Sequence, residues 1–99
     1  MKILALSHRR PDATDDKFLP YLHEELRRAW ELYKNGAIRD FYWRQDRPGV
    51  AVFLECESTV EAQNILASLP FVKVGLLDFE VIPLGPFTNW EVLYAPAGK

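Results

Sequence analysis

The sequence has 99 residues, of which 48% are hydrophobic and 26% are charged, and its formal net charge is −2. This length suits a single domain, and the apolar content is ample for one core, which excludes a disordered chain. The near-neutral charge argues against a nucleic-acid-binding protein, because such proteins normally carry a strongly basic surface.

The chain begins with an apolar run, residues 3–7, which predicts a short buried strand ending at the polar stretch 8–12. The orientation of this strand stays open, because both its odd-numbered and its even-numbered residues can lie beneath a helix. The run is too short for a secretion signal or a membrane span. We therefore expect a cytoplasmic protein without membrane contact.

A first helix is predicted by apolar residues at spacings of three and four. Pro20 is incompatible with a helix interior, so we expect a short turn near residues 14–18 and the main helix from about 19 to 34. The Asn35-Gly36 pair provides the stop. We interpret the apolar side chains of this helix as core packing: Phe18, Leu22, Leu26, Ala29, Trp30 and Tyr33.

Two further strands, 38–45 and 50–56, are joined by a turn of Asp, Arg, Pro and Gly. Ser58 and Glu61 form a capping box, which predicts that a second helix begins there. A fourth strand is predicted at residues 76–84. The order of these elements is that of the ferredoxin-like βαββαβ fold, an α+β class with an antiparallel four-stranded sheet and two helices on one face.

Side chains alternate between the two faces of a strand, which separates an apolar face beneath the helices from a mixed face. The helix-facing set is Phe41, Trp43, Val52, Leu54, Cys56, Leu77, Phe79 and Val81. The mixed face combines Tyr42, Phe53, Leu76 and Ile82 with Asp40, Arg44, Glu55, Asp78 and Glu80. Such a mixture suits a homodimer interface that encloses a cavity for a small-molecule ligand.

The domain organisation follows from the end of the fourth strand. Residues 1–86 form the predicted α+β barrel domain, and residues 87–99 form a tail rich in aromatic residues. This tail is too apolar for a free end, so we expect it to pack either on its own domain or on the partner subunit.

Four stretches carry a likeness to a known family. They are Gly36 to Arg44 with its Trp-Arg pair, Val52 to Ser58 (VFLECES), Leu66 to Phe71 (LASLPF) and Leu77 to Val81 (LDFEV). The chain resembles the muconolactone delta-isomerase family from the first strand to Pro86, and more closely a subgroup of small bacterial proteins of uncertain role. The resemblance implies a dimeric α+β barrel, able to assemble further, and a proton shift next to a lactone carbonyl.

Such an isomerase needs a base for a carbon acid and a group that stabilises enolate-like charge. One of the acidic residues of the mixed face, or His8, can be the base, and this choice stays open. The predicted catalytic residues are His8, Arg44, Glu55 and Asp78, and the predicted substrate-binding residues are Tyr42, Phe53 and Glu80. A structural interpretation competes, in which the acid–arginine pairs are interface salt bridges.

The sequence shows no Gly-rich phosphate loop, no Ser-His-Asp arrangement and no metal-ligand spacing. Its single cysteine, Cys56, excludes a multi-cysteine zinc site. We therefore expect no metal and no cofactor. The leading hypothesis is an isomerase or lyase that transfers protons on a small lactone or enol-like metabolite. The alternatives are a non-catalytic dimer that binds a small molecule or serves as an accessory subunit, and a purely structural dimer without a cavity.

Overall fold

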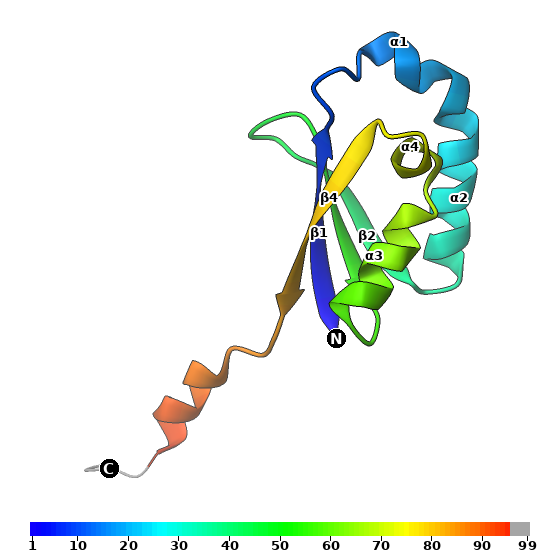
Figure 1. Ribbon diagram of the computed structural model, residues 1–99. Coiled ribbons are helices and arrows are strands. Elements are labelled where there is room, and N and C mark those ends of the chain that lie inside the picture. Colours follow the sequence, from blue (N-terminus) through cyan, green and yellow to red (C-terminus); the bar gives the residue numbers. More distant parts are fainter. Residues whose placement is uncertain (96–99) are drawn as a thin grey trace.

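Four antiparallel strands form one sheet, and the helices between them lie on one face of it (Figure 1). The computed structural model describes residues 1–95. The strands are β1 (Lys2–Arg9), β2 (Ile38–Trp43), β3 (Val50–Glu55) and β4 (Leu77–Leu84), and their order across the sheet is β2-β3-β1-β4. This is the ferredoxin-like βαββαβ arrangement that the element order predicts.

The chain from β1 to β2 is helical in three consecutive pieces, α1 (Asp15–Phe18), the 3₁₀ turn η1 (Leu19–Tyr21) and α2 (Leu22–Lys34). The break comes at Pro20, which confirms the predicted short turn ahead of a main helix. The second helical segment consists of α3 (Thr59–Ala67) and α4 (Pro70–Lys73). No helix within residues 1–95 is long and apolar enough to cross a membrane.

The predicted capping box at the start of α3 is present. The Ser58 hydroxyl accepts a hydrogen bond from the Glu61 amide at 3.0 Å. The Glu61 carboxylate reaches back to the amide of Glu57, at 2.7 Å. Both bonds satisfy amides that the first turn of a helix leaves without a partner, so the start of α3 is determined locally.

The core lies between the helices and the odd-numbered side chains of β1, which resolves the orientation that the sequence left open. Ile3 pairs with Leu54 and Ala5 with Val52, and all four side chains are fully buried. Cross-strand partners share a face, so the helix-facing set of β3 is the predicted one. A β-bulge near Arg39 keeps the alternation of β2 in phase with this core.

Of two residues near strand ends, one differs from the face prediction and one agrees with it. Leu76 was expected on the mixed face, but it precedes β4 and is buried, with its amide bonded to the Phe71 carbonyl at 2.9 Å. Cys56 follows β3 and is buried in the core as expected. The alternation of side chains between the two faces applies only within a strand, and Leu76 lies in the turn between α4 and β4.

The apolar stripe of α2 packs against the core at Ala29 but not along its whole length, which corrects part of its interpretation as packing. Leu32 is the buried position of this helix, at 2% exposure, whereas Leu22 and Leu26 are 43% and 60% exposed. Trp30 and Tyr33 are also exposed. The helix therefore contacts the sheet with only part of its apolar surface.

The last described element, η2 (Thr88–Tyr94), stands away from the sheet and its helices (Figure 1). We call residues 85–95 the arm. The radius of gyration is 17.1 Å, against about 13 Å for a compact chain of this length. The predicted tail also includes residues 96–99, which lie outside the described part of the chain. Packing of the arm on a partner subunit stays a prediction.

The hairpin between β2 and β3 depends on Gly49, which gives the first testable prediction. Gly49 has a φ of +137°, and a Cβ at this position would lie 3.1 Å from the Ser7 carbonyl oxygen and 3.3 Å from its hydroxyl. Ser7 is buried, and its hydroxyl accepts a hydrogen bond from the Val50 amide at 2.9 Å. We expect Gly49→Ala to lower the free energy of unfolding by about 1–3 kcal/mol.

The control for this variant is Gly85→Ala. A Cβ on Gly85 would meet no atom within 4 Å, and its φ lies outside the left-handed region. We therefore expect almost no change in stability for Gly85→Ala. Urea denaturation of both variants measures the difference, and equal stabilities would contradict the role assigned to Gly49.

Candidate functional site

A cavity of about 1330 Å³ lies between α2 and the helix-facing side of the sheet. Its wall is mainly apolar and draws on α2, β2, α4 and β4. The exposed stripe of α2 forms one side, and Phe41 and Trp43 of β2 face it. Trp43 is 75% exposed, so the cavity is open rather than sealed. An apolar cleft with few polar groups is the usual form of a small-molecule site.

Three carboxyl residues line this wall, Asp15, Glu25 and Asp40, and Glu25 is the one whose pKa is raised. It lies on α2 among the apolar stripe residues, three positions after Leu22 and four before Ala29. One of its carboxylate oxygens accepts a hydrogen bond from the Phe71 amide at 2.9 Å, in the first turn of α4. Burial raises the pKa of Glu25, and the Phe71 amide offsets part of this effect. A carboxyl with a raised pKa can exchange protons closer to neutral pH than a solvated one.

Arg44 contributes a hydrogen-bond donor at the rim of the same cavity. Its Nε and Nη2 atoms donate to the two carboxylate oxygens of Asp46, at 3.0 and 2.7 Å. The remaining nitrogen, Nη1, is buried and has no hydrogen-bond partner among the described residues. A buried donor without a partner is costly. The Asp46 carboxylate, with a smaller contribution from Glu80 of the opposite face, raises the pKa of Arg44, so this side chain stays a cation at the rim.

Aromatic side chains form a flat part of the wall. The rings of Trp30 and Tyr33 are stacked, with centroids 5.6 Å apart and an interplanar angle of 29°. Both residues line the cavity and are about half exposed. Their position corrects the expectation that they serve packing alone. Stacked rings beside an apolar wall suit a planar ligand.

The residues predicted from the sequence as catalytic are mostly elsewhere. His8 and Glu80 lie on the opposite face of the sheet, with His8 Nε2 3.6 Å from the Glu80 carboxylate. Asp78 pairs with Arg10 at 3.1 Å. Glu55 pairs with the N-terminal amine, also at 3.1 Å. All four are exposed, which agrees with the structural interpretation of these charges as ion pairs.

The register of β1 shows how far apart these acids are. Glu55 lies opposite Lys2, whereas Asp78 lies opposite His8, six residues further along the strand. At about 3.3 Å per residue this separation is roughly 20 Å. Within one chain the structure therefore does not bring Glu55 and Asp78 together with Arg44 around one enclosed space.

Of the three remaining predicted site residues, Tyr42 and Arg44 reach the cavity and Phe53 does not. Tyr42 lines it together with Arg44. Phe53 lies on the mixed face, where its ring packs edge-to-face against Tyr42 at 6.2 Å. The residue that the sequence interpretation missed is Glu25. The sequence pattern that could have indicated it is a carboxylate within an apolar helical stripe, because burying a charged group there is costly unless it has a partner.

No group of three or more His, Cys, Asp or Glu side chains in the described part of the chain is arranged to hold a metal ion. The polar side chains that line the cavity carry carboxyl, guanidinium and hydroxyl groups: Asp15, Glu25, Asp40, Arg9, Arg44, Ser7, Tyr33 and Tyr42. These groups can bind oxygen atoms, polarise a carbonyl and move protons.

The comparison with known proteins identifies the fold. No family model matches the sequence, and no curated protein matches it. Among solved structures, the chain is similar to 5-chloro-2-hydroxyhydroquinone dehydrochlorinase from Burkholderia phenoliruptrix AC1100, in complex with 2,5-dihydroxybenzoquinone. The TM-score is 0.69 at 19% sequence identity, and the match covers 90% of this chain and 98% of the other. This likeness establishes a shared small α+β barrel-type fold.

The burial of Glu25 predicts a pH dependence of stability. Because the pKa is raised in the folded state, the folded protein binds this proton more tightly, and its stability falls as the pH rises above about 4.5. Glu25→Gln removes the titration and keeps an acceptor for the Phe71 amide. We expect this variant to gain stability relative to the wild type as the pH rises from 4 to 7.

Urea denaturation at several pH values measures this difference. The control is Glu24→Gln, since Glu24 is exposed beside Arg27 on the same turn of α2. A constant difference between Glu25→Gln and the wild type over this pH range would contradict the assigned burial of the Glu25 carboxyl.

Proposed function

We propose that this protein is a small-molecule enzyme of the isomerase or lyase type, acting without a cofactor by proton transfer on a lactone or enol-like metabolite. The observation that carries the proposal is the position of Glu25, a carboxyl with a raised pKa in the wall of a large apolar cavity. The likeness to the muconolactone delta-isomerase family supports the reaction class. The fold shared with a dehydrochlorinase is compatible with it.

The proposed chemistry uses two groups of the cavity. The ionised Glu25 carboxylate removes a proton from the carbon next to a carbonyl, and the electron pair of the broken C–H bond moves to the carbonyl oxygen. The positive charge of Arg44, at the rim of the cavity, stabilises this developing oxyanion. Glu25 then returns its proton to another carbon of the conjugated system, which completes an isomerisation. The loss of a leaving group in place of this last step gives the lyase variant.

Glu25 replaces the acids of the mixed face as the proposed base for a physical reason. The carboxylates of Asp78, Glu80 and Glu55 each lie near a cationic or ionisable partner and are exposed to solvent. Their carboxylate oxygens already contact these partners outside the cavity. The Glu25 carboxyl lies in the cavity wall, where burial raises its pKa.

A second candidate is a non-catalytic protein that binds a small planar molecule. The observation in its favour is the stacked Trp30–Tyr33 pair, together with the predominance of apolar groups in the wall. Binding by stacking and burial needs no proton transfer. The two functions differ in whether Glu25 affects turnover.

The catalytic proposal predicts a large effect of Glu25→Gln on proton exchange. The measurement is deuterium incorporation from D₂O into muconolactone, followed by NMR, with the full chain. Loss of a general base lowers rates by about 10²–10⁴-fold, and we expect a decrease in this range. Glu24→Gln is the matched control and should retain wild-type exchange.

The outcomes separate the two candidates. Exchange that survives Glu25→Gln unchanged would contradict the assigned role of this residue. Ligand-dependent melting in the absence of any exchange would favour the binding protein. In that case Trp30→Ala should weaken the ligand-dependent shift, whereas Glu25→Gln should leave it nearly unchanged.

We also propose that the mixed face of the sheet pairs with a second copy of the chain. The face carries Leu4, Leu6, Phe53 and Ile82, all half-buried in the single chain and surrounded by charges. Burying such apolar area contributes about 25 cal/mol per Å². An interface of mixed character closes one side of the domain without covering the cavity on its other side.

Light scattering tests this dimer. The wild type should have twice the chain mass of 11.5 kDa at micromolar concentration. Ile82→Glu places an unpaired charge in the proposed interface and should weaken association at least tenfold. Gln63→Glu, on the exposed side of α3, is the control and should remain dimeric. A wild-type monomer at this concentration would contradict the proposed pairing.

A further inference from the structure

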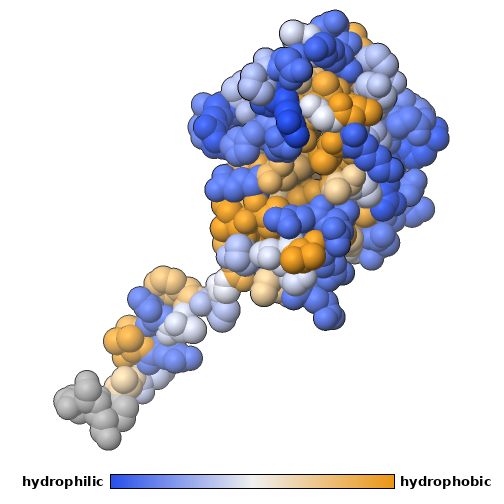
Figure 2. Space-filling model, in the orientation of Figure 1, coloured by the Kyte–Doolittle hydropathy of each residue, from blue (hydrophilic) through white to orange (hydrophobic). Residues whose placement is uncertain are grey.

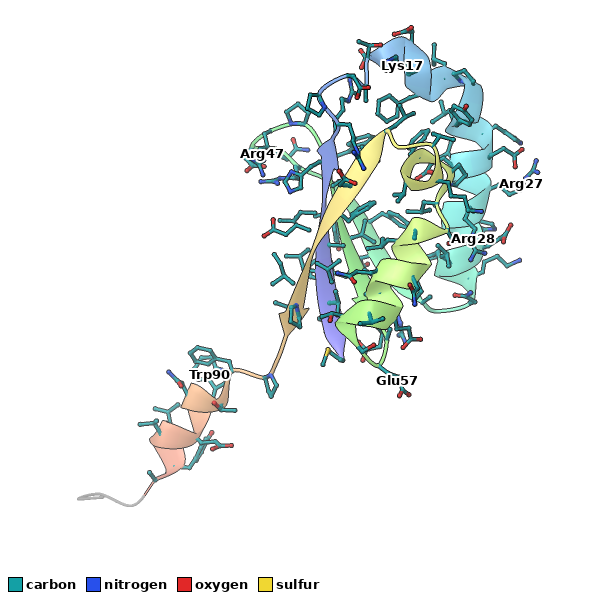
Figure 3. All side chains as sticks on the ribbon, viewed as in Figure 1. Lys17, Arg27, Arg28, Arg47, Glu57 and Trp90 are labelled. Carbon is teal, nitrogen blue, oxygen red and sulfur yellow. The ribbon has the colours of Figure 1, made fainter. Side chains whose placement is uncertain are left out.

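The arm presents an apolar stripe that no part of its own domain covers. Residues three apart lie above one another in a 3₁₀ helix, so Trp90 and Leu93 share one side of η2, and the N-cap residue Phe87 extends this stripe through its contact with Trp90. Phe87, Trp90 and Leu93 are 62%, 64% and 72% exposed. The rings of Phe87 and Trp90 contact each other, with centroids 5.2 Å apart. Hydrophobic residues are visible along the projecting arm in Figure 2, and Trp90 lies far from the domain in Figure 3.

The composition of the arm is that of a segment that docks on a surface. Glu91 is the one charged residue between positions 87 and 95. Gly85 connects the arm to β4 and has open space around it, so the arm can change direction there. Phe87, Trp90 and Leu93 belong to the types that proteins bury.

The cavity offers an apolar surface of the same kind, because one of its sides is open. Leu26, Trp30 and Trp43 line it and are 60%, 59% and 75% exposed. These residues lie on α2 and β2, so the open side runs along the β2 edge of the sheet. We call this open side the groove. A cover over the groove would exclude water from the Glu25 carboxyl and from a bound ligand.

The arm and the groove of one chain are on opposite edges of the sheet. The arm continues from β4, and two strands separate β4 from β2. At about 4.8 Å between neighbouring strands, the arm would have to cross roughly 14 Å of sheet to reach its own groove. An arm that leaves the domain along the direction of β4 is therefore badly placed to close its own cavity (Figure 1).

A second copy removes this obstacle by symmetry. When two identical sheets stack face to face with a two-fold axis along the strands, β4 of each chain lies over β2 of the other. The end of β4 and the start of β2 are at the same end of the sheet, since Pro83 and Ile38 are both in register with the Ile3–Leu54 pair. The partner's arm then emerges over the mixed face at the start of the edge strand β2, and it reaches the groove by turning around this edge toward the end of α2, where Trp30 and Tyr33 are stacked.

We propose that the arm of one chain docks in the groove of a second copy, with its Phe87–Trp90–Leu93 stripe against α2 and β2, so that each active cavity is completed by the partner subunit. This inference rests on the proposed dimer and specifies its symmetry axis. The ligand is then enclosed between Glu25 of one chain and the aromatic arm of the other.

Subunit exchange followed by cross-linking tests the docking. Chains carrying Leu93→Cys are mixed with chains of different mass tag carrying Leu26→Cys, both in a Cys56→Ser background, and mild oxidation follows. Docking predicts a covalent heterodimer on a non-reducing gel. Val92→Cys mixed with Leu26→Cys is the matched control, because Val92 lies outside the stripe, and its yield should be about tenfold lower.

Each outcome has a definite meaning. Equal yields for the two mixtures, or no covalent product from a protein that light scattering shows to be dimeric, overturn the docking and leave the dimer standing. A cross-link within a single chain carrying both Leu93→Cys and Leu26→Cys also overturns it. A wild-type monomer overturns the proposed dimer and the docking together.

A second measurement compares the wild type with single alanine variants of the arm and needs no cross-linking. Fluorescence of 8-anilinonaphthalene-1-sulfonate reports exposed apolar surface, and Trp90→Ala should raise it several-fold by releasing the arm from the groove. Val92→Ala should leave it unchanged. A Trp90→Ala protein with wild-type dye fluorescence would contradict the docking.

Discussion

The packing of α2 on the sheet determines both the core and the cavity. The helix contacts the core through Leu32 and Ala29, while most of its wider apolar stripe stays exposed at the cavity. A helix that buried its whole stripe would fill the space above β2. Because only one side of the stripe is buried, the domain retains a stable core of Ile3, Ala5, Val52 and Leu54 beside an open cleft.

Glu25 connects this packing to chemistry. Its carboxylate binds the first turn of α4 through the Phe71 amide, which places α2 relative to α4 and holds the carboxyl in the cavity wall. The same residue therefore stabilises the arrangement of two helices and carries a raised pKa. A hydrogen bond from a helix N-terminus compensates part of the cost of burying the group. A fixed carboxyl with a tuned pKa is what proton transfer requires.

The two faces of the sheet have different proposed tasks. The helix-facing side holds the core and the cavity, and the mixed side carries the ion pairs His8–Glu80 and Asp78–Arg10 along with half-buried apolar residues. Pairing of the mixed faces would bring the edge strand β4 of one chain next to β2 of another. The exposed arm and the open groove, which have no explanation within a single chain, then complete each other.

The sequence alone determined the order of elements, the break at Pro20, the capping box at Ser58 and the alternation of the two faces, because these depend on contacts between residues close in the chain or on a fixed period. Tertiary structure decided which side of β1 is buried, since Ile3 and Leu4 are equally apolar and only the packing of helices separates them. The tertiary structure also determined which side chains line the candidate cavity. The alternation of the strands places the acids of the mixed face on one side of the sheet. In the structure, however, Glu55 and Asp78 lie opposite different ends of β1. Glu25 resembles a surface glutamate on a helix in the sequence, and only the position of α4 beside α2 half-buries its carboxyl.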